Sequence, residues 1–403
     1  GVTGVQTCAL PILVFRWWTI IWSLPAFAAA PVDFRPFWDI GVSGLIILSV
    51  SVLLAAGSAV HGGVPAVDSR HRSIGFEQDL KIALIIASVL SFLSVQLLLS
   101  DLGLDARIFL DPEKLIENAV TTSIARYYQD YSPPFGIRVM LCFLYLSGFL
   151  SGWLIAIGKS RKNMLLVSVA FLPPVAWMVL LTTKASILFW LIFAVAGHQV
   201  FGVRESKAVN FRAVLSLMVL VCALGAILFW TQLSRSGGDF DRDAKDVYSV
   251  FVVSAVGHLF AFREWVDAGI PWLPVEFGQS SFAGLVELLG GKIRTPGLYS
   301  FANVYVGDVS TNVYSALRPL LEDVGLLVAA VIMLSLGWLC RVLEVSGTLV
   351  GRAVLAGFLS WILWSPITSV FNYNSIIGAL VMLVGLAYWI SLGDSVRDRA
   401  SVS

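Results

Sequence analysis

Charged side chains are scarce in this sequence. Asp, Glu, Lys and Arg together fill 13% of 403 positions, against about one quarter in soluble domains. Apolar residues fill 58%. Water is therefore not the main solvent of this chain, and a net charge of +1 argues against a basic face for nucleic acid. We expect a protein that partners with the lipid bilayer and not with nucleic acid.

Cysteine is also rare, and no two cysteines have the close spacing of a metal or redox pair. The chain contains no glycine loop of the Walker type, no HExxH and no GxSxG, the short patterns typical of nucleotide, zinc and serine-nucleophile chemistry. We therefore expect neither a metal nor a cofactor. The cysteines are interpreted as apolar filler: Cys8, Cys142, Cys222 and Cys340.

What the chain does contain is a series of long apolar runs. Several approach the roughly 20 residues that a helix needs to cross the hydrocarbon of a bilayer, and the alternation typical of a membrane barrel is absent. The sequence predicts an all-α polytopic integral membrane protein of about ten transmembrane helices. The spans are expected near residues 13–30, 39–60, 80–100, 137–157, 164–182, 186–202, 212–231, 322–340, 353–370 and 375–392.

The orientation follows from Lys and Arg in the short loops, because positive charge there is retained in the cytoplasm. Alternate short loops carry such residues, which predicts that both termini are cytoplasmic. The long segments 101–136 and 232–311 then face the opposite side, with short turns around Arg35, Lys184 and Asn372. The basic positions are Arg70, Arg72, Lys159, Arg161, Lys162, Arg204, Lys207, Arg212, Arg341, Arg352, Arg397 and Arg399.

The remaining segments complete the expected organisation. Residues 1–12 (GVTGVQTCALPI) resemble the translated read-through of a sequencing adapter, so we expect an assembly artefact there and a missing true start. Residues 13–403 are expected to form a single membrane domain. Segment 101–136 is either a short interfacial helix or a connector, and the apolar stretch 247–262 is interpreted as re-entrant because it is short for a span.

Cationic side chains gather on the extracytoplasmic side, contrary to the retention rule. Arg235, Arg263, Lys292 and Arg294 lie in the second long segment, which the rule largely exempts. Arg318 is different because it stands at the head of an apolar run, one turn before Glu322, where the two side chains can pair at i,i+4.

Histidine offers one further candidate. His258 lies within an apolar stretch, where an ionisable group is costly and indicates function by default. For the other histidines, at 61, 71 and 198, a solvated or packed role is the favoured interpretation.

Residues 311–325 (TNVYSALRPLLEDVG) resemble the signature that enters a late span in oligosaccharide repeat unit polymerases, the Wzy-type O-antigen and capsular polysaccharide polymerases. Residues 257–269 (GHLFAFREWVDAG) and 277–290 (FGQSSFAGLVELLG) are similar to the long periplasmic loop of the same family. The resemblance covers residues 180–340 well. Related O-antigen ligases carry His-Asn where this chain has Thr311-Asn312, and those relatives tend to place Arg where this chain has Lys184.

The resemblance implies a membrane glycosyltransferase with a GT-C-like fold in the bacterial inner membrane. Its donor and acceptor would be undecaprenyl-diphosphate-linked oligosaccharides, joined at the outer leaflet without a metal. A chain-length regulator protein is a further implied partner. Two alternatives stay open: a ligase, which differs only in its acceptor, and a flippase, which predicts inverted repeats with interrupted helices in both halves.

The residues fit this chemistry, because fixed cations stabilise the negative charge that develops on a diphosphate leaving group. Guanidinium groups suit phosphate oxygens. For diphosphate and glycan contacts we expect Arg235, Arg263, Arg294 and Arg318, with Lys184 in addition. A general base is sought among Glu322, Asp323, Glu264 and His258, with Glu322 alternatively orienting Arg318. Asn312 and Tyr314 either bind sugar or cap the helix that follows, and Trp265 and Trp272 either stack on sugars or lie at the membrane interface.

Overall fold

The computed structural model describes residues 41–59, 74–128, 131, 133–158, 160–202, 261–267, 269, 278–290, 304–306, 309–311 and 315–402. The chain divides into two compact units, one of Arg72–Phe251 and one that combines Gly1–His71 with Val252–Ser403. Among the residues that the structure describes, five helices are long and apolar enough to cross a membrane. The predicted class, a helical protein with several membrane-length helices, is confirmed, whereas the count of about ten spans stays a prediction.

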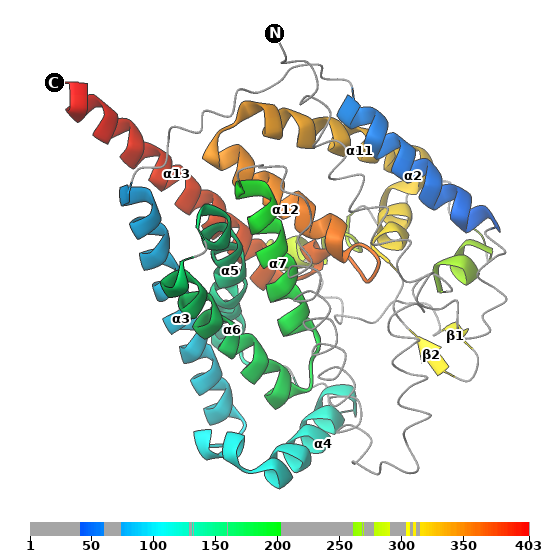
Figure 1. Ribbon diagram of the computed structural model, residues 1–403. Coiled ribbons are helices and arrows are strands. Elements are labelled where there is room, and N and C mark those ends of the chain that lie inside the picture. The colour runs from blue at the N-terminus through cyan, green and yellow to red at the C-terminus, as the bar shows by residue number, and fades with distance from the viewer. Residues whose placement is uncertain are drawn as a thin grey trace, which may run out of the picture. The chain divides into compact units, whose positions relative to one another are not determined.

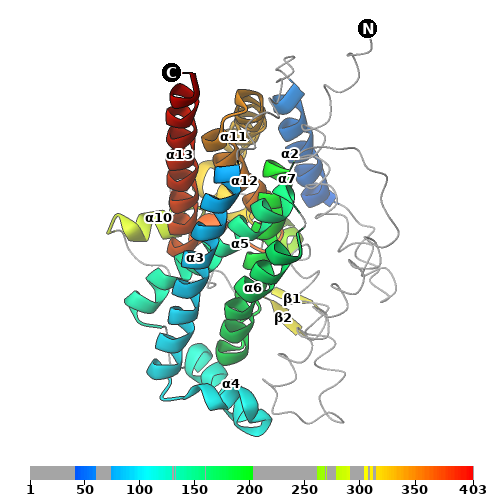
Figure 2. The same cartoon turned by 60° about the vertical axis from the view of Figure 1, so that its left-hand side comes forward.

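The unit Arg72–Phe251 is a group of long helices that pack side by side (Figures 1 and 2). A shorter helix, α4, lies at one end of the group against α6. The elements are α3 (Ile74–Asp101), η3 (Ala106–Leu110), α4 (Pro112–Tyr128), α5 (Phe135–Ile157), α6 (Arg161–Leu181) and α7 (Ala185–Phe201). Segment 101–136 therefore contains a helix, whereas its place along the membrane interface stays a prediction.

Helices α5 and α7 approach closely because small residues face the partner backbone. A Cβ on Gly152 would collide with the Ala194 carbonyl, and one on Gly197 would collide with the Phe149 carbonyl. Such small residues are how membrane helices gain packing contacts where lipid is as apolar as the side chains. The Trp190 indole N–H also donates to Ser147 Oγ at 3.0 Å between these helices.

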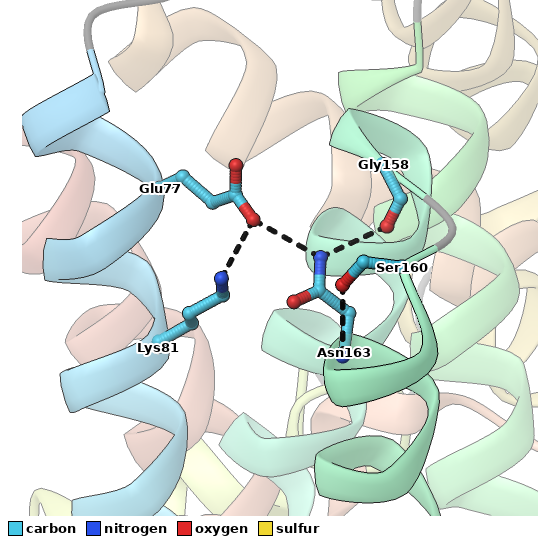
Figure 3. Close-up of polar contacts among 5 residues, drawn as sticks. All are labelled: Glu77, Lys81, Gly158, Ser160 and Asn163. Carbon is cyan, nitrogen blue, oxygen red and sulfur yellow. Dashed lines mark hydrogen bonds and ion pairs between the residues drawn. The ribbon is translucent and has the colours of Figure 1, made fainter.

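A polar cluster joins the start of α3 to the start of α6 (Figure 3). The Asn163 side-chain amide donates to Glu77 Oε1 at 3.1 Å and to the Gly158 carbonyl at 2.9 Å. Lys81 Nζ lies 2.7 Å from the same Glu77 oxygen. These contacts explain why α3 begins at Ile74 and not near residue 80 as predicted: the charged residues are paired inside the helix.

The second described unit contains the remaining helices and a small hairpin. Helix α2 (Gly41–Ala59) packs along α11 (Leu317–Ser346), and α12 (Leu349–Trp364) contacts both α11 and α13 (Asn374–Val402). Strands β1 (Val304–Val306) and β2 (Val309–Thr311) pair antiparallel, with Tyr305 opposite Ser310. Three shorter elements separate the longer helices along the sequence. They are a short helix over 261–267, α10 (Ala283–Leu288) and η4 (Val370–Asn372).

Helix α11 is broken at Gly325, whose φ of 71° and ψ of 171° are not helical. A positive φ of this kind is favourable only for glycine. The break separates a short first segment, 317–324, from a long apolar segment. The predicted span 322–340 therefore merges parts of two segments, and the helix begins five residues earlier because the first segment belongs to a polar site.

The C-terminal helices follow the prediction with shifted ends. Helix α12 ends at Trp364 and not at residue 370, because Pro366 has no backbone N–H with which to continue the helical hydrogen bonds. Cys142 and Cys340 are buried free cysteines, which confirms for these two the interpretation as apolar filler. The expected spans 13–30 and 212–231 and most of the stretch 247–262 lie outside the described residues.

Candidate functional site

The first segment of α11 carries a buried ion pair. Arg318 is 1% exposed, and its Nε donates to Glu322 Oε1 at 2.8 Å. The pairing at i,i+4 that the sequence predicts is confirmed. A guanidinium and a carboxylate removed from water need such close geometry, because the loss of hydration otherwise exceeds their attraction.

An aromatic ring supports the cation from a second element. The guanidinium carbon of Arg318 lies 5.5 Å from the centroid of the Trp265 ring, a distance at which the ring face attracts a cation. Trp265 belongs to the short helix 261–267 and packs on Phe262 at 5.9 Å between centroids. For Trp265, the structure therefore places the indole against Arg318.

Arg263 lies on the same short helix but is far more accessible. Its Nε is 3.4 Å from Asp267 Oδ2, and the two side chains are 27% and 50% exposed. An exposed pair of this kind holds its partners only weakly. The site thus combines Arg318, which is buried and fixed, with Arg263, which is accessible. Arg263 lies two residues before Trp265, the tryptophan that contacts Arg318.

Asp323 holds a distant loop segment. Its two carboxylate oxygens accept hydrogen bonds from the backbone N–H groups of Ser280 at 3.0 Å and Ser281 at 2.6 Å. Asp323 is 1% exposed. Because both oxygens already accept hydrogen bonds, this carboxylate is placed to position the loop and is a poor choice among the four proposed bases.

Asn372 holds the same two residues from the other side. Its side-chain amide nitrogen lies 2.9 Å from the carbonyl oxygens of both Ser280 and Ser281 in the orientation that satisfies them, with its oxygen accepting from the Thr368 hydroxyl. Amide orientation is assigned from such networks. The backbone of residues 280–281 is therefore bonded to α11 through its donors and to η4 through its acceptors.

Helix α10 follows this segment and is packed against the start of α13. Glu287 Oε2 accepts a 2.7 Å hydrogen bond from Asn374 Nδ2. A Cβ on Gly284 would lie 2.8 Å from Asn374 Oδ1 and 2.9 Å from the Phe371 carbonyl, so only glycine allows this approach. The Phe282 ring stacks on Phe371 at 5.6 Å between centroids.

The structure brings together part of the predicted set. Arg263, Arg318, Glu322 and Asp323 lie in the unit that includes Val252–Ser403, and Glu264 is exposed on the short helix. Lys184 is half-buried before α7 in the other unit. The remaining candidates lie outside the described residues: Arg235, His258, Trp272, Lys292, Arg294, Asn312 and Tyr314.

Sequence reasoning missed the residues that hold α10. Asn372 and Asn374 stand in an NYN run between two apolar spans, a polar signal that the prediction used only to mark a short outer turn. Among the residues that the structure describes, no group of three or more His, Cys, Asp or Glu side chains lies close enough to hold a metal ion.

Comparison with known proteins adds no relative. No protein family model matches the chain, and neither a curated protein nor a solved structure is significantly similar to it.

Proposed function

We propose that this protein is a membrane glycosyltransferase that polymerises undecaprenyl-diphosphate-linked oligosaccharide repeat units. The observation that carries the proposal is the buried Arg318–Glu322 pair under Trp265 at the head of an apolar, membrane-length helix. Ionisable side chains in such a place are costly and indicate function by default. The residues of the motif at 311–325 also have separate structural roles. Arg318 and Glu322 form an ion pair, Asp323 bonds to a loop, and Gly325 breaks the helix.

The chemistry needs a cation that is already in place. In the proposed reaction an acceptor hydroxyl oxygen forms a bond to the sugar C1, the C1–O bond to the diphosphate breaks, and a base takes the hydroxyl proton. Negative charge grows on the diphosphate, and preorganised cations stabilise it without rearranging during the step. Glu322 and Trp265 fix Arg318 in this way, while Arg263 is accessible for phosphate contact.

The other roles stay within the same proposal. Lys184, Arg235, Arg294, Asn312 and Tyr314 are assigned to substrate contacts, and His258 or Glu322 to proton transfer. The proposed location is the bacterial inner membrane, with a chain-length regulator as partner. A flippase would favour matched interruptions in two halves, whereas among the described helices α11 is broken at Gly325 and α6 continues through Pro173 and Pro174.

The test uses purified protein in lipid nanodiscs with a single lipid-linked repeat unit. A polymerase yields a ladder of products, a ligase needs a different acceptor, and a flippase yields no new bond. Arg318→Ala is expected to lower the polymerisation rate by about a hundredfold, the cost typical of removing one preorganised donor.

A matched control lies on the same helix. Arg341 forms a comparable pair with Glu344 at 3.1 Å, with 5% and 12% exposure, near the other end of α11. Arg341→Ala removes a buried pair of the same kind. The folded fraction of this variant is expected to produce the same ladder of products as the wild type. If the two alanine variants reduce polymerisation equally, or the wild type produces no ladder, the proposal is wrong.

A further inference from the structure

The turn between α6 and α7 contains a strained residue. Thr182 follows the last residue of α6 with φ 54° and ψ 30°, a left-handed conformation that is a genuine outlier for a β-branched side chain. Helices commonly end in this conformation on glycine, which has no Cβ to clash. Thr182 is also 2% exposed. Strained backbone persists only where the surrounding contacts fix it, and it gathers at functional sites. The contacts around this turn therefore indicate what it holds in place.

Hydrogen bonds from two neighbouring helices fix the turn. Asn118 Nδ2 of α4 donates to the carbonyl of Leu180 at 3.0 Å, one of the last carbonyls of α6, which lack a partner within the helix. The Asn118 amide is itself oriented, because its oxygen accepts from the buried Thr122 hydroxyl at 3.2 Å. On the other side, Ser186 Oγ of α7 donates to the Pro174 carbonyl of α6 at 3.1 Å. The turn is therefore held from α4 and from α7.

This turn carries a cation. Lys184 comes two residues after Thr182 and directly precedes α7, with helical φ and ψ of −64° and −23°. It is half-buried, and its carbonyl accepts the Leu188 N–H at 3.2 Å. A lysine that only anchors a helix end at the membrane interface works through a flexible stem and gains nothing from a strained turn. The rigid backbone instead fixes the place from which the ammonium group can reach an anion.

We propose that Asn118 and Thr182 are positioning residues, which hold the Lys184 ammonium group in place for the diphosphate of the lipid-linked donor. This inference rests on the proposed function, which assigns Lys184 to substrate contact. A cation that is fixed before the donor binds stabilises negative charge without rearranging. Figure 2 shows α4 beside one end of α6, and the bond from Asn118 identifies it as the end that leads to Lys184. The role of α4 is thus to hold this turn.

The first experiment separates positioning from packing with two variants. Thr182→Gly removes the Cβ, and glycine adopts a φ of 54° without a steric penalty, so this variant is expected to unfold at the wild-type temperature or above it. Asn118→Asp keeps the shape but places an acceptor opposite the Leu180 carbonyl. We expect each variant to lower kcat/KM in the ladder assay about tenfold, because a small displacement of a positioned group slows catalysis. A packing role alone predicts that Thr182→Gly is fully active.

The matched control is Thr121→Ala on α4. Thr121 is exposed, and its hydroxyl donates to the Glu117 carbonyl of the same helix at 2.9 Å. This variant is expected to retain the wild-type kcat/KM. Wild-type activity of both Thr182→Gly and Asn118→Asp, or the same loss in Thr121→Ala, would overturn the inference.

A measurement without turnover separates failure of this inference from failure of the proposed function. The rate at which an amine reagent acylates Lys184 is followed by mass spectrometry in nanodiscs that contain anionic phospholipid, with the exposed Lys162 at the start of α6 as reference. Undecaprenyl diphosphate is expected to slow acylation of Lys184 about tenfold in the wild type, because the bound anion covers the amine, and to lose most of this effect in both variants.

The two failures have different signatures. Equal protection of Lys184 in all three proteins, or no protection in the wild type, would overturn the positioning role, and a ladder formed by the same wild type would leave the polymerase proposal in place. If protection depends on Asn118 and Thr182 but the wild type forms no ladder, the polymerase proposal fails while the positioned lysine stands.

Discussion

Arg318 and Glu322 are each expensive to bury alone and tolerable together. Removing one partner of such a pair leaves an uncompensated charge and typically costs about 3–5 kcal/mol, whereas apolar replacement of both is often neutral or stabilising. Their burial, at 1% and 7% exposure, therefore predicts different effects on folding and on activity.

The first prediction follows from this difference. Arg318→Ala is expected to lower the free energy of unfolding by about 3–5 kcal/mol, while Arg318→Met combined with Glu322→Leu restores much of the stability and no polymerisation. Thermal unfolding in detergent and the ladder assay check the two expectations. An active double variant would show that the pair is structural only.

The second prediction concerns Asp323, whose two oxygens accept backbone hydrogen bonds from Ser280 and Ser281. Asp323→Asn exchanges one acceptor for a donor that faces an N–H group, so one buried N–H loses its partner at a cost of about 1–3 kcal/mol. Hydrogen exchange of residues 278–290 is expected to accelerate, while that of α5 does not change. Unchanged exchange would show that Asp323 does not hold the loop.

These residue contacts differ in how far the sequence reveals them. The Arg318–Glu322 pair follows from helix periodicity alone, since residues four apart share a face. The partners of Asp323 are 42 and 43 positions away, a separation that no local pattern encodes. Residue-scale prediction therefore located the head of α11 but missed the bonds that hold α10 there.

At the scale of elements, the break in α11 sets the direction of the first segment. Gly325→Ala would place a side chain at φ 71° and ψ 171°, a region that is essentially restricted to glycine and costs another residue about 1–3 kcal/mol. The third prediction is that this variant loses stability and shifts residues 317–324, which lowers polymerisation. Its control is Gly385→Ala on α13, where an added Cβ meets nothing within 4 Å. Equal behaviour of the two variants would contradict a role for the break.

The fourth prediction concerns the start of α4, outside the membrane-spanning helices. Asp111 accepts a hydrogen bond from the Lys114 backbone N–H at 3.2 Å and pairs with Lys114 Nζ at 3.2 Å. These contacts lower the pKa of Asp111 below its ordinary value of 3.8, with the backbone bond as the first cause. A lowered pKa stabilises the folded state above the unfolded pKa, and the contribution is lost as pH falls through the folded pKa.

Amide exchange along α4 is therefore expected to rise, relative to α5, as pH falls below 3.8. In Asp111→Ala the cap is absent at every pH, so the exchange ratio should already be high near neutral pH and should not rise further. A ratio that rises equally in both proteins would assign the effect to other carboxylates.

Several helices were predicted within a few residues of their observed bounds, because lipid demands apolar runs of a fixed length. The span 137–157 corresponds to α5 at Phe135–Ile157, and 375–392 falls within α13. The shifted starts of α3 and α6 have polar partners elsewhere in the chain, at Glu77 and Asn163. Composition cannot show such partners, so the prediction ended those helices at the first charge.

At the scale of the whole molecule, the proposal requires that both arginines and α10 face the same side of the bilayer. Trp265 links the helix of Arg263 to Arg318, and Asp323 links the Arg318 segment to α10. The long segment of α11 after Gly325 runs to Ser346, about 30 Å of helix at 1.5 Å per residue. That length matches the hydrocarbon of a bilayer, so the proposal places Ser346 on the opposite side.

The fifth prediction is a labelling pattern with a thiol reagent that does not cross membranes, applied to intact cells. Arg263→Cys and Leu289→Cys are expected to react from outside, because both positions are at least partly exposed at the site end. Ser346→Cys, exposed at the far end of α11, is expected to react only after permeabilisation. The native Cys142 and Cys340 are buried, and the protein without added cysteines, which also contains Cys8 and Cys222, sets the background. Reaction of 263 and 289 from opposite sides would rule out a shared site, since segments joined through Trp265 and Asp323 cannot lie on both faces of the bilayer.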